Sequence, residues 1–316
     1  RRAPAAACLG VVTALAALGV VAPDGHDQGP LSVAAVQGGG PRGLRAVDSD
    51  PRRVFDAHLE ASRRLVVPGS VDLVLWPEDV VDVDHTFAGS PEEAELSELA
   101  RELGATVVAG VVEEEAGRAG EAGRFRNAAV VFGPDGAVVS RYDKVHRVPF
   151  GEYVPWRSFL DGLVDLSAVP RDAVAGEGAA VVGSPHGRLA VVISYEVFFA
   201  DRARSGVTAG GRLLLVPTNA SSYTTEQVPA QEVAVARLRA VETGRWTVQA
   251  APTGYSVIVD HRGRVVVQGG LGGQEVLAAE VRLRSGLTLA SRAGDWPVLV
   301  LAGLVFGLSW AIRKKT

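Results

Sequence analysis

Five short apolar runs, each ending at or just before a polar residue or proline, constrain the fold of this chain most. They are LSVAAVQ (31–37), VDLVLWP (71–77), ATVVAGVV (105–112), RLAVVIS (188–194) and RLLLVPT (212–218). Their length and their richness in valine and leucine are typical of strands that are buried on both faces. Helical patterns separate several of these runs, and such alternation favours an α/β fold.

Capping and turn signals predict where helices and a hairpin begin and end. Asp50-Pro51 predicts a helix start, with aspartate as N-cap and proline at the first helical position. Ser90-Pro91-Glu92-Glu93 predicts a second start through a capping box. A third helix is predicted over 226–243 and ends at Gly244, and Pro134-Asp135-Gly136 predicts a hairpin turn. We therefore predict one domain of about 260 residues with a mixed sheet that helices cover on one side.

Both ends of the chain carry apolar segments. Residues 3–21 are apolar apart from Thr13, and residues 296–312 are apolar apart from Ser309. We expect two membrane helices, since a span needs about 20 apolar residues, and the basic residues flanking them place both termini in the cytoplasm. The middle of the chain then lies outside the cytoplasm. A signal peptide for the first segment, or a buried hairpin of core helices, is the alternative.

The composition singles out one lysine. Of the 32 Lys and Arg residues, only Lys144, Lys314 and Lys315 are lysines, so arginine serves almost everywhere as the general cation. We therefore expect Lys144 to be chemically required. The chain has no methionine, even at its first position, and we expect it to be a fragment or a processed chain.

Composition also argues against several classes of function. The net charge is −4 and the basic residues are scattered, which argues against a nucleic-acid partner. Cys8 is the only cysteine, and the six histidines lack metal-ligand spacing. No disulfide, metal or cofactor is predicted.

Three apolar runs end near residues that could carry chemistry. Glu78 follows LVLWP, Lys144 follows VVSRYD, and Ser194 follows AVVI. Ligand sites of α/β folds gather beyond the carboxyl ends of strands, so we expect these side chains to meet. A base, a cation and a nucleophile in one cleft would suit acyl transfer. His146 is an alternative general base, or a simple loop histidine.

Several motifs of this chain occur in the same order in one enzyme family. They are LVLWPED, RYDKVHRVPFGEYVPWR, VVISYEVFF, VPTNAS and RLRAVETGR. The chain thereby resembles, over about residues 31–312, the apolipoprotein N-acyltransferase family, the membrane-bound branch of the nitrilase or carbon–nitrogen hydrolase superfamily. The resemblance implies an α/β fold in which a nitrilase-like αββα sandwich is flanked by transmembrane helices.

The resemblance also implies roles for individual residues. Glu78 would be the general base, Lys144 would stabilise the oxyanion, and Ser194 would stand at the nucleophile position. Glu152 matches a second glutamate near the site, and it acts there or only caps a turn. Tyr195 and Glu196 match residues that flank the nucleophile, although Tyr195 could serve packing alone.

Two features depart from the family pattern. The family nucleophile is cysteine, whereas this chain has Ser194. The loop after the first strand reads GLRAVDSDP and lacks a tryptophan that relatives carry. Of the family's membrane helices, only the last two have counterparts here.

The resemblance implies a setting at the bacterial cell membrane. The expected acyl donor is a phospholipid, and the expected acceptor is the N-terminal amine of a diacylated lipoprotein. We expect a membrane helix and linker over 1–26, a nitrilase-like domain over 27–290 on the extracytoplasmic side, and a membrane helix with a basic tail over 291–316.

Serine at the nucleophile position leaves three hypotheses. A hydroxyl is far less acidic than a thiol and needs more help from a base. The chain could be an acyltransferase that works with serine, a catalytically impaired homologue that binds lipoprotein or assists an active paralogue, or an amidase-type hydrolase.

Overall fold

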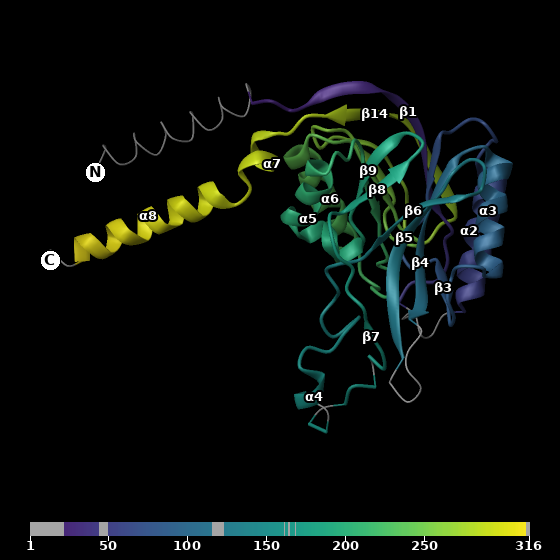
Figure 1. Ribbon diagram of the computed structural model, residues 1–316, viewed down its shortest axis with the longest axis horizontal. Helices are drawn as coiled ribbons and strands as arrows, with labels where there is room; N and C mark the ends of the chain where they lie inside the picture. Colours follow the sequence, from purple (N-terminus) through teal and green to yellow (C-terminus); the bar gives the residue numbers. More distant parts are fainter. Residues whose placement is uncertain are drawn as a thin grey trace.

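The computed structural model describes residues 22–43, 50–115, 123–160, 162–163, 165–167 and 169–313. Its body is a sandwich of two β-sheets lying between two layers of helices (Figure 1). The strands of the first sheet are β1 (His26–Gln37), β2 (Leu73–Leu75), β3 (Val81–Val83), β4 (Thr106–Glu115), β5 (Arg124–Phe132), β6 (Val138–Asp143), β7 (Asp172–Ala173) and β14 (Glu275–Ser285). They follow the order β14-β1-β2-β4-β5-β6, with β3 beside β4 and β7 beside β5.

The second sheet has the order β13-β12-β11-β10-β9-β8. Its central strands β9, β10 and β11 run parallel, and antiparallel strands complete both edges. The carboxyl ends of the parallel strands therefore meet at one end of the sheet. The strands are β8 (Val181–Ser184), β9 (Gly187–Val191), β10 (Leu214–Pro217), β11 (Thr247–Ala250), β12 (Val257–Val259) and β13 (Val265–Gln268).

Helices cover both outer faces, so the prediction of one mixed sheet with helices on one side was wrong. Helices α2 (Pro51–Leu65) and α3 (Pro91–Leu103) cover the first sheet, and α5 (Ala200–Thr208) and α6 (Gln227–Thr243) cover the second (Figure 1). The αββα arrangement is the one that the resemblance implied.

Strand β1 shows why two layers of core form. Val33 and Ala35 join a core that also holds strands of the second sheet, whereas Ala34 and Val36 pack in the core that α2 and α3 cover. Side chains alternate along a strand, so a run that is apolar at every position must be covered on both faces.

The predicted helix ends are confirmed. The Asp50 side chain accepts from the backbone N–H of Arg52, and Ser90 accepts from that of Glu93. Helix α6 stops at Gly244, whose φ of 65° lies in the left-handed region that glycine tolerates. These local signals hold because each depends on a few neighbouring residues.

The strand predicted over 188–194 ends early. Strand β9 stops at Val191, and residues Ser194–Phe198 form the 3₁₀ turn η2. The backbone of Ser194 has φ 47°, a left-handed value that cannot continue a strand. Val192 and Ile193, which lie between β9 and η2, are also buried, so the apolar run continues past the end of the strand. This is why the sequence pattern suggested a longer strand.

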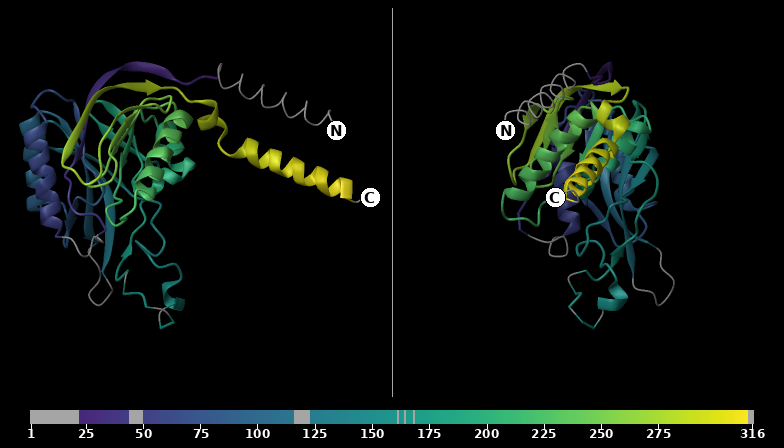
Figure 2. Two further views of the ribbon diagram at one scale, coloured as in Figure 1. Left: turned by 180° about the vertical axis from the view of Figure 1, so that it is seen from behind. Right: turned by 90° about the vertical axis from the view of Figure 1, so that its left-hand side faces the viewer.

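The chain also carries elements beyond the sandwich. A short helix, α4 (Arg157–Leu160), lies in an arm beside β7, and α7 (Leu289–Ala293) leads to α8 (Trp296–Arg313). Helix α8 projects away from the sandwich, as the left view of Figure 2 shows.

The predicted membrane segments have different outcomes. Within the part of the chain that the structure describes, no helix is both long enough and apolar enough to cross a membrane. The span predicted over 296–312 is therefore not confirmed. The span predicted over 3–21 lies outside the described residues.

Candidate active site

Lys144 lies buried between two carboxylates at one end of the first sheet. Its Nζ is 2.7 Å from Oε1 of Glu78 and 2.8 Å from Oε1 of Glu152. Asn127 of β5 donates through Nδ2 to the same two oxygens, at 2.9 and 3.1 Å. The four side chains form one hydrogen-bonded cluster, which we call the lysine cluster.

Local backbone geometry brings these side chains together. Lys144 follows the last residue of β6 directly, and Glu78 lies three residues beyond β2. Strand β4 carries Gly110 beside that exit, where a Cβ would lie 2.2 Å from the backbone oxygen of Pro77. Only glycine therefore lets the chain pass close enough to bring Glu78 to Lys144.

Charge balance favours the protonated lysine. Burial lowers the pKa of Lys144, but Glu78 and Glu152 outweigh burial and hold the pKa above its usual range. Burial raises the pKa of Asp79 well above its usual range, and the charges of Asp82, Glu78 and Glu152 raise it further. The cluster therefore holds a fixed cation, as stabilisation of an oxyanion requires.

Glu152 both pairs with Lys144 and caps a turn. Its Oε2 accepts from the backbone N–H of Val148 at 2.7 Å, while its Oε1 accepts from Lys144. The two interpretations of Glu152 from the sequence are therefore compatible.

Ser194 begins η2 and is 8% exposed. Its Oγ lies 3.3 Å from Oγ1 of Thr218, which follows β10, and Thr218 Oγ1 lies 2.7 Å from Oε1 of Glu232 on α6. A non-glycine residue in the left-handed region costs about 1–3 kcal/mol, and such strain is concentrated at functional sites.

Glu196 ties the Ser194 turn to the segment after Lys144. Its Oε1 accepts from the backbone N–H groups of Val145 (2.8 Å) and His146 (3.0 Å), and its Oε2 accepts from that of Ile193 (2.9 Å). Tyr142 also donates its hydroxyl to this carboxylate. Glu196 is fully buried, so it fixes the position of η2 relative to the lysine cluster.

The rings of Tyr195 and His146 both contact the ring of Phe199. The Tyr195 ring packs edge-on to Phe199 with ring centroids 5.0 Å apart, and the His146 ring does the same at 4.3 Å. Packing was the alternative for Tyr195, and a loop position was the alternative for His146.

The predicted residues fall into two groups. Glu78 and Glu152 each accept a hydrogen bond from Lys144. Ser194 is connected to them indirectly, because the Glu196 carboxylate accepts from the backbone before Ser194 and from the backbone after Lys144. The charges of Glu78 and Lys144 affect the pKa of Glu232. Thr218 in turn connects Glu232 to Ser194 through two hydrogen bonds. The two groups therefore belong to one region.

Sequence reasoning missed Asn127, Thr218 and Glu232. Thr218 ends an apolar run, as Ser194 does, so its position gave a usable signal. Glu232 is a buried acid within α6, and the sequence showed nothing that set it apart from the other acids of that helix. Among the described residues, no group of three or more His, Cys, Asp and Glu side chains is arranged to hold a metal ion.

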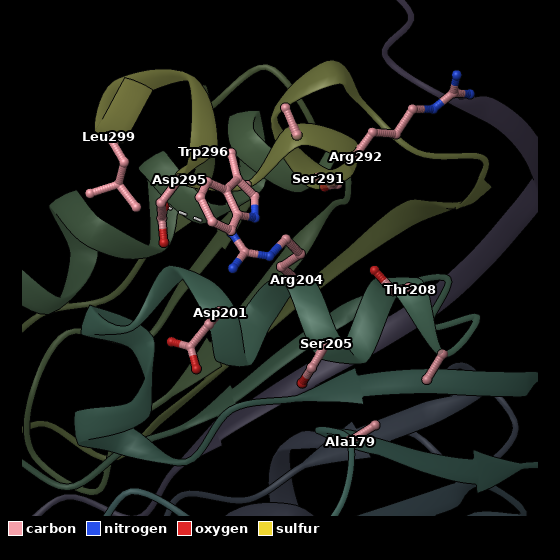
Figure 3. A pocket seen from close by; sticks show the side chains of 13 residues that line it. Ala179, Asp201, Arg204, Ser205, Thr208, Ser291, Arg292, Asp295, Trp296 and Leu299 are labelled. Atoms are coloured by element: carbon pink, nitrogen blue, oxygen red, sulfur yellow. Dashed lines mark ion pairs between the residues drawn. The ribbon is translucent and has the colours of Figure 1, made fainter. Parts of the chain in front are cut away.

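A hollow of about 730 Å³ lies elsewhere, between α5, α7 and the start of α8 (Figure 3). Arg204 faces Asp295 there, with 3.8 Å between guanidinium and carboxylate. None of the residues of the lysine cluster lines this hollow.

The sequence matches the family model described as carbon–nitrogen hydrolase over residues 32–286. Among curated proteins it is similar to the apolipoprotein N-acyltransferases of Geobacter metallireducens (33% identical; 91% of this chain, 55% of that protein) and Mycolicibacterium smegmatis (31%; 88% and 48%). The chain thus spans about half the length of the curated relatives it matches.

Solved structures of the nitrilase superfamily share the fold. Saccharomyces cerevisiae Nit3 superposes with a TM-score of 0.57 at 20% identity, covering 82% of this chain and 92% of Nit3. A cysteine-to-serine mutant of the Nesterenkonia AN1 amidase superposes with a TM-score of 0.56 at 23% identity, covering 80% and 91%. These likenesses establish the nitrilase-like α/β fold.

Proposed function

Since the chain belongs to the carbon–nitrogen hydrolase family, we propose that it transfers an acyl chain from a phospholipid to the N-terminal amine of a diacylglyceryl-cysteine lipoprotein. Its curated relatives carry the name apolipoprotein N-acyltransferase. The observation that carries the proposal is the buried Lys144 between Glu78 and Glu152, tied by Glu196 to the Ser194 turn.

Acylation begins at Ser194. Its Oγ attacks the ester carbonyl of the phospholipid, a C–O bond forms, and the hydroxyl proton moves to Glu78. Lys144 stabilises the charge that collects on the carbonyl oxygen. The intermediate loses the lysophospholipid alcohol, which takes the proton from Glu78, and an acyl ester remains on Ser194.

Transfer to the lipoprotein follows the same path in reverse. The N-terminal amine attacks the acyl ester, and its proton passes to Glu78. The bond between the acyl carbon and Oγ breaks, and Ser194 recovers the proton from Glu78. Glu152 and Asn127 keep Lys144 and Glu78 in place through both steps, since Glu152 accepts from Lys144 and Asn127 donates to both glutamates.

We further propose that the protein works at a bacterial cell membrane, with residues 27–290 on the extracytoplasmic side and with residues 1–26 and 291–316 as attachments. Helix α8 supports this because its apolar side chains face solvent, with Val298 70% and Phe306 71% exposed. Trp296 and Trp310 flank the apolar stretch, as interfacial anchors do. We expect the full chain to float with phospholipid vesicles. We expect the double variant Val298→Glu/Phe306→Glu to lose this flotation.

A second candidate follows from the serine itself. General-base catalysis is worth about 10²–10⁴-fold, and a hydroxyl needs more of it than a thiol does. A protein arrested before acylation would still bind lipid and lipoprotein, and it would be a silent homologue of the acyltransferases.

The deciding experiment follows a model diacylated lipopeptide by mass spectrometry after incubation with the full chain and phospholipid vesicles. We expect N-acylation by the wild type, its loss in Glu78→Gln, and its retention in the exposed control Glu177→Gln. Product from Ser194→Cys but not from the wild type would favour the silent homologue. Release of free fatty acid without lipopeptide product would favour a hydrolase.

A further inference from the structure

Thr218 stands between Ser194 and a second buried acid. Its Oγ1 is 3.3 Å from Ser194 Oγ and 2.7 Å from Glu232 Oε1, and Thr218 itself is fully buried. The lysine cluster does not include Glu232, and the acyl-transfer steps above do not use it.

A threonine hydroxyl has one proton, so the direction of these two hydrogen bonds is coupled. When Glu232 is ionised, Thr218 must donate to it, and Thr218 is left to accept the proton of Ser194. When Glu232 is neutral, it donates to Thr218, and Thr218 can donate to Ser194. In the second arrangement the proton of Ser194 is free to move to Glu78.

The surroundings of Glu232 favour its neutral form. The residue is 4% exposed, and its Oε2 is buried without a hydrogen-bond partner among the described residues. An ionised carboxylate with an unpaired buried oxygen is costly. Burial raises the pKa of Glu232 to about 7; the Thr218 hydrogen bond and Lys144 lower it, and Glu78 raises it.

Two charged groups on elements that pack against α6 are directed elsewhere. Turn η2 packs on α6 and carries Glu196, which is turned toward backbone N–H groups. Helix α5 also packs on α6, and its Arg202 donates to Tyr142. Glu78 and Lys144 are thus the charged side chains whose fields act on Glu232.

We propose that neutral Glu232 is a positioning residue that turns the Thr218 hydroxyl toward Ser194, so that Thr218 stabilises the charge growing on Oγ during attack. The proposal rests on the function proposed above. It explains how a serine can serve where the family has cysteine, because a donor to the nucleophile oxygen offsets part of the low acidity of a hydroxyl.

The test measures the reactivity of Ser194 without lipid or lipoprotein. A long-chain alkyl fluorophosphonate forms an Oγ–P bond with Ser194, fluoride leaves, and the hydroxyl proton passes to Glu78. Intact mass spectrometry of the full chain gives the labelling rate across pH 5–9, and Ser194→Ala confirms the site. We expect the wild-type rate to fall by about 10-fold or more as pH rises through about 7 and Glu232 ionises.

Three variants separate positioning from a structural role. Glu232→Gln keeps a donor to Thr218 at every pH, so the fall near pH 7 should vanish. Thr218→Val should lower the rate by about 10- to 100-fold at pH 6, and Thr218→Ser should restore it. Thermal unfolding of each variant checks that the fold is kept.

Three results would overturn the proposal. One is a Glu232→Gln profile that still falls near pH 7, and the other is a Thr218→Val rate that equals the wild type. Absence of wild-type labelling at every pH would overturn it as well. A wild type that is labelled at Ser194 with the expected pH profile, yet transfers no acyl chain to lipopeptide, would contradict the proposed function alone.

Discussion

Lys144 donates to Glu78 across 2.7 Å, and both side chains are almost completely buried. Buried ion pairs stabilise little relative to apolar packing, but the removal of one partner is strongly destabilising because the other charge is left buried. The presence of this ion pair is therefore better explained by a catalytic role than by a contribution to the stability of the fold.

Lys144→Met tests whether the buried carboxylates depend on the lysine ammonium. We expect the free energy of unfolding to fall by about 3–5 kcal/mol in urea denaturation, since Glu78 and Glu152 lose their cation. The exposed pair between Arg63 and Glu102 gives the matched control, and Arg63→Met should cost less than about 1 kcal/mol. A loss below 1 kcal/mol in Lys144→Met would show that the carboxylates do not need the ammonium.

A double variant separates stability from activity. Adding Glu78→Gln to Lys144→Met removes one of the two uncompensated carboxylates and should recover part of the lost stability. Acyl transfer should stay absent, because both the proposed base and the proposed oxyanion partner are gone. Recovery of acyl transfer in the mass-spectrometric assay would exclude these roles.

Sequence reasoning reached the lysine cluster because its signals are local. Glu78 and Lys144 lie just beyond strands, and Lys144 is a rare lysine in an arginine-rich chain. The two-sheet arrangement was not evident from the strands themselves, since pairings such as β1 with β14 join residues about 250 positions apart. Thr218 and Glu232 were missed for a similar reason, because their relation to Ser194 exists only after β9, β10 and α6 have packed.

Glu196→Gln should separate the Ser194 turn from the lysine cluster. The amide would place an N–H group against a backbone N–H of Val145, His146 or Ile193, leaving a buried donor unpaired. We expect a loss of about 1–3 kcal/mol in unfolding free energy and a slower acyl transfer. The exposed Glu177→Gln should change neither, and equal stability of the two variants would mean that Glu196 does not hold the turn.

Ser194→Gly and Ser194→Ala should differ in stability although both lack the hydroxyl. The φ of 47° brings a Cβ close to the backbone, and glycine removes that contact. We expect Ser194→Gly to be more stable than Ser194→Ala by about 1 kcal/mol in urea denaturation. Alanine as the more stable variant would show that the turn relaxes out of the left-handed region.

His58 should make stability depend on pH. Its Nε2 accepts from the backbone N–H of Gly38 (3.0 Å), so Nδ1 carries the proton and donates to the backbone oxygen of Val54 (2.8 Å). Burial lowers the pKa of His58 from 6.5 to about 4, although the Val54 contact opposes this. The unfolded chain therefore binds more protons between these values, and stability falls as pH falls from about 6.5 to 4.

The size and origin of this effect can be measured by difference. A pKa shift from 6.5 to about 4 corresponds to roughly 3 kcal/mol, so the wild type should lose about that much more stability than His58→Gln between pH 7 and pH 4. Parallel curves for the wild type and His58→Gln would mean that the pKa of His58 is the same in the folded and unfolded protein. A histidine without a pKa difference between the two states adds no pH dependence to the stability.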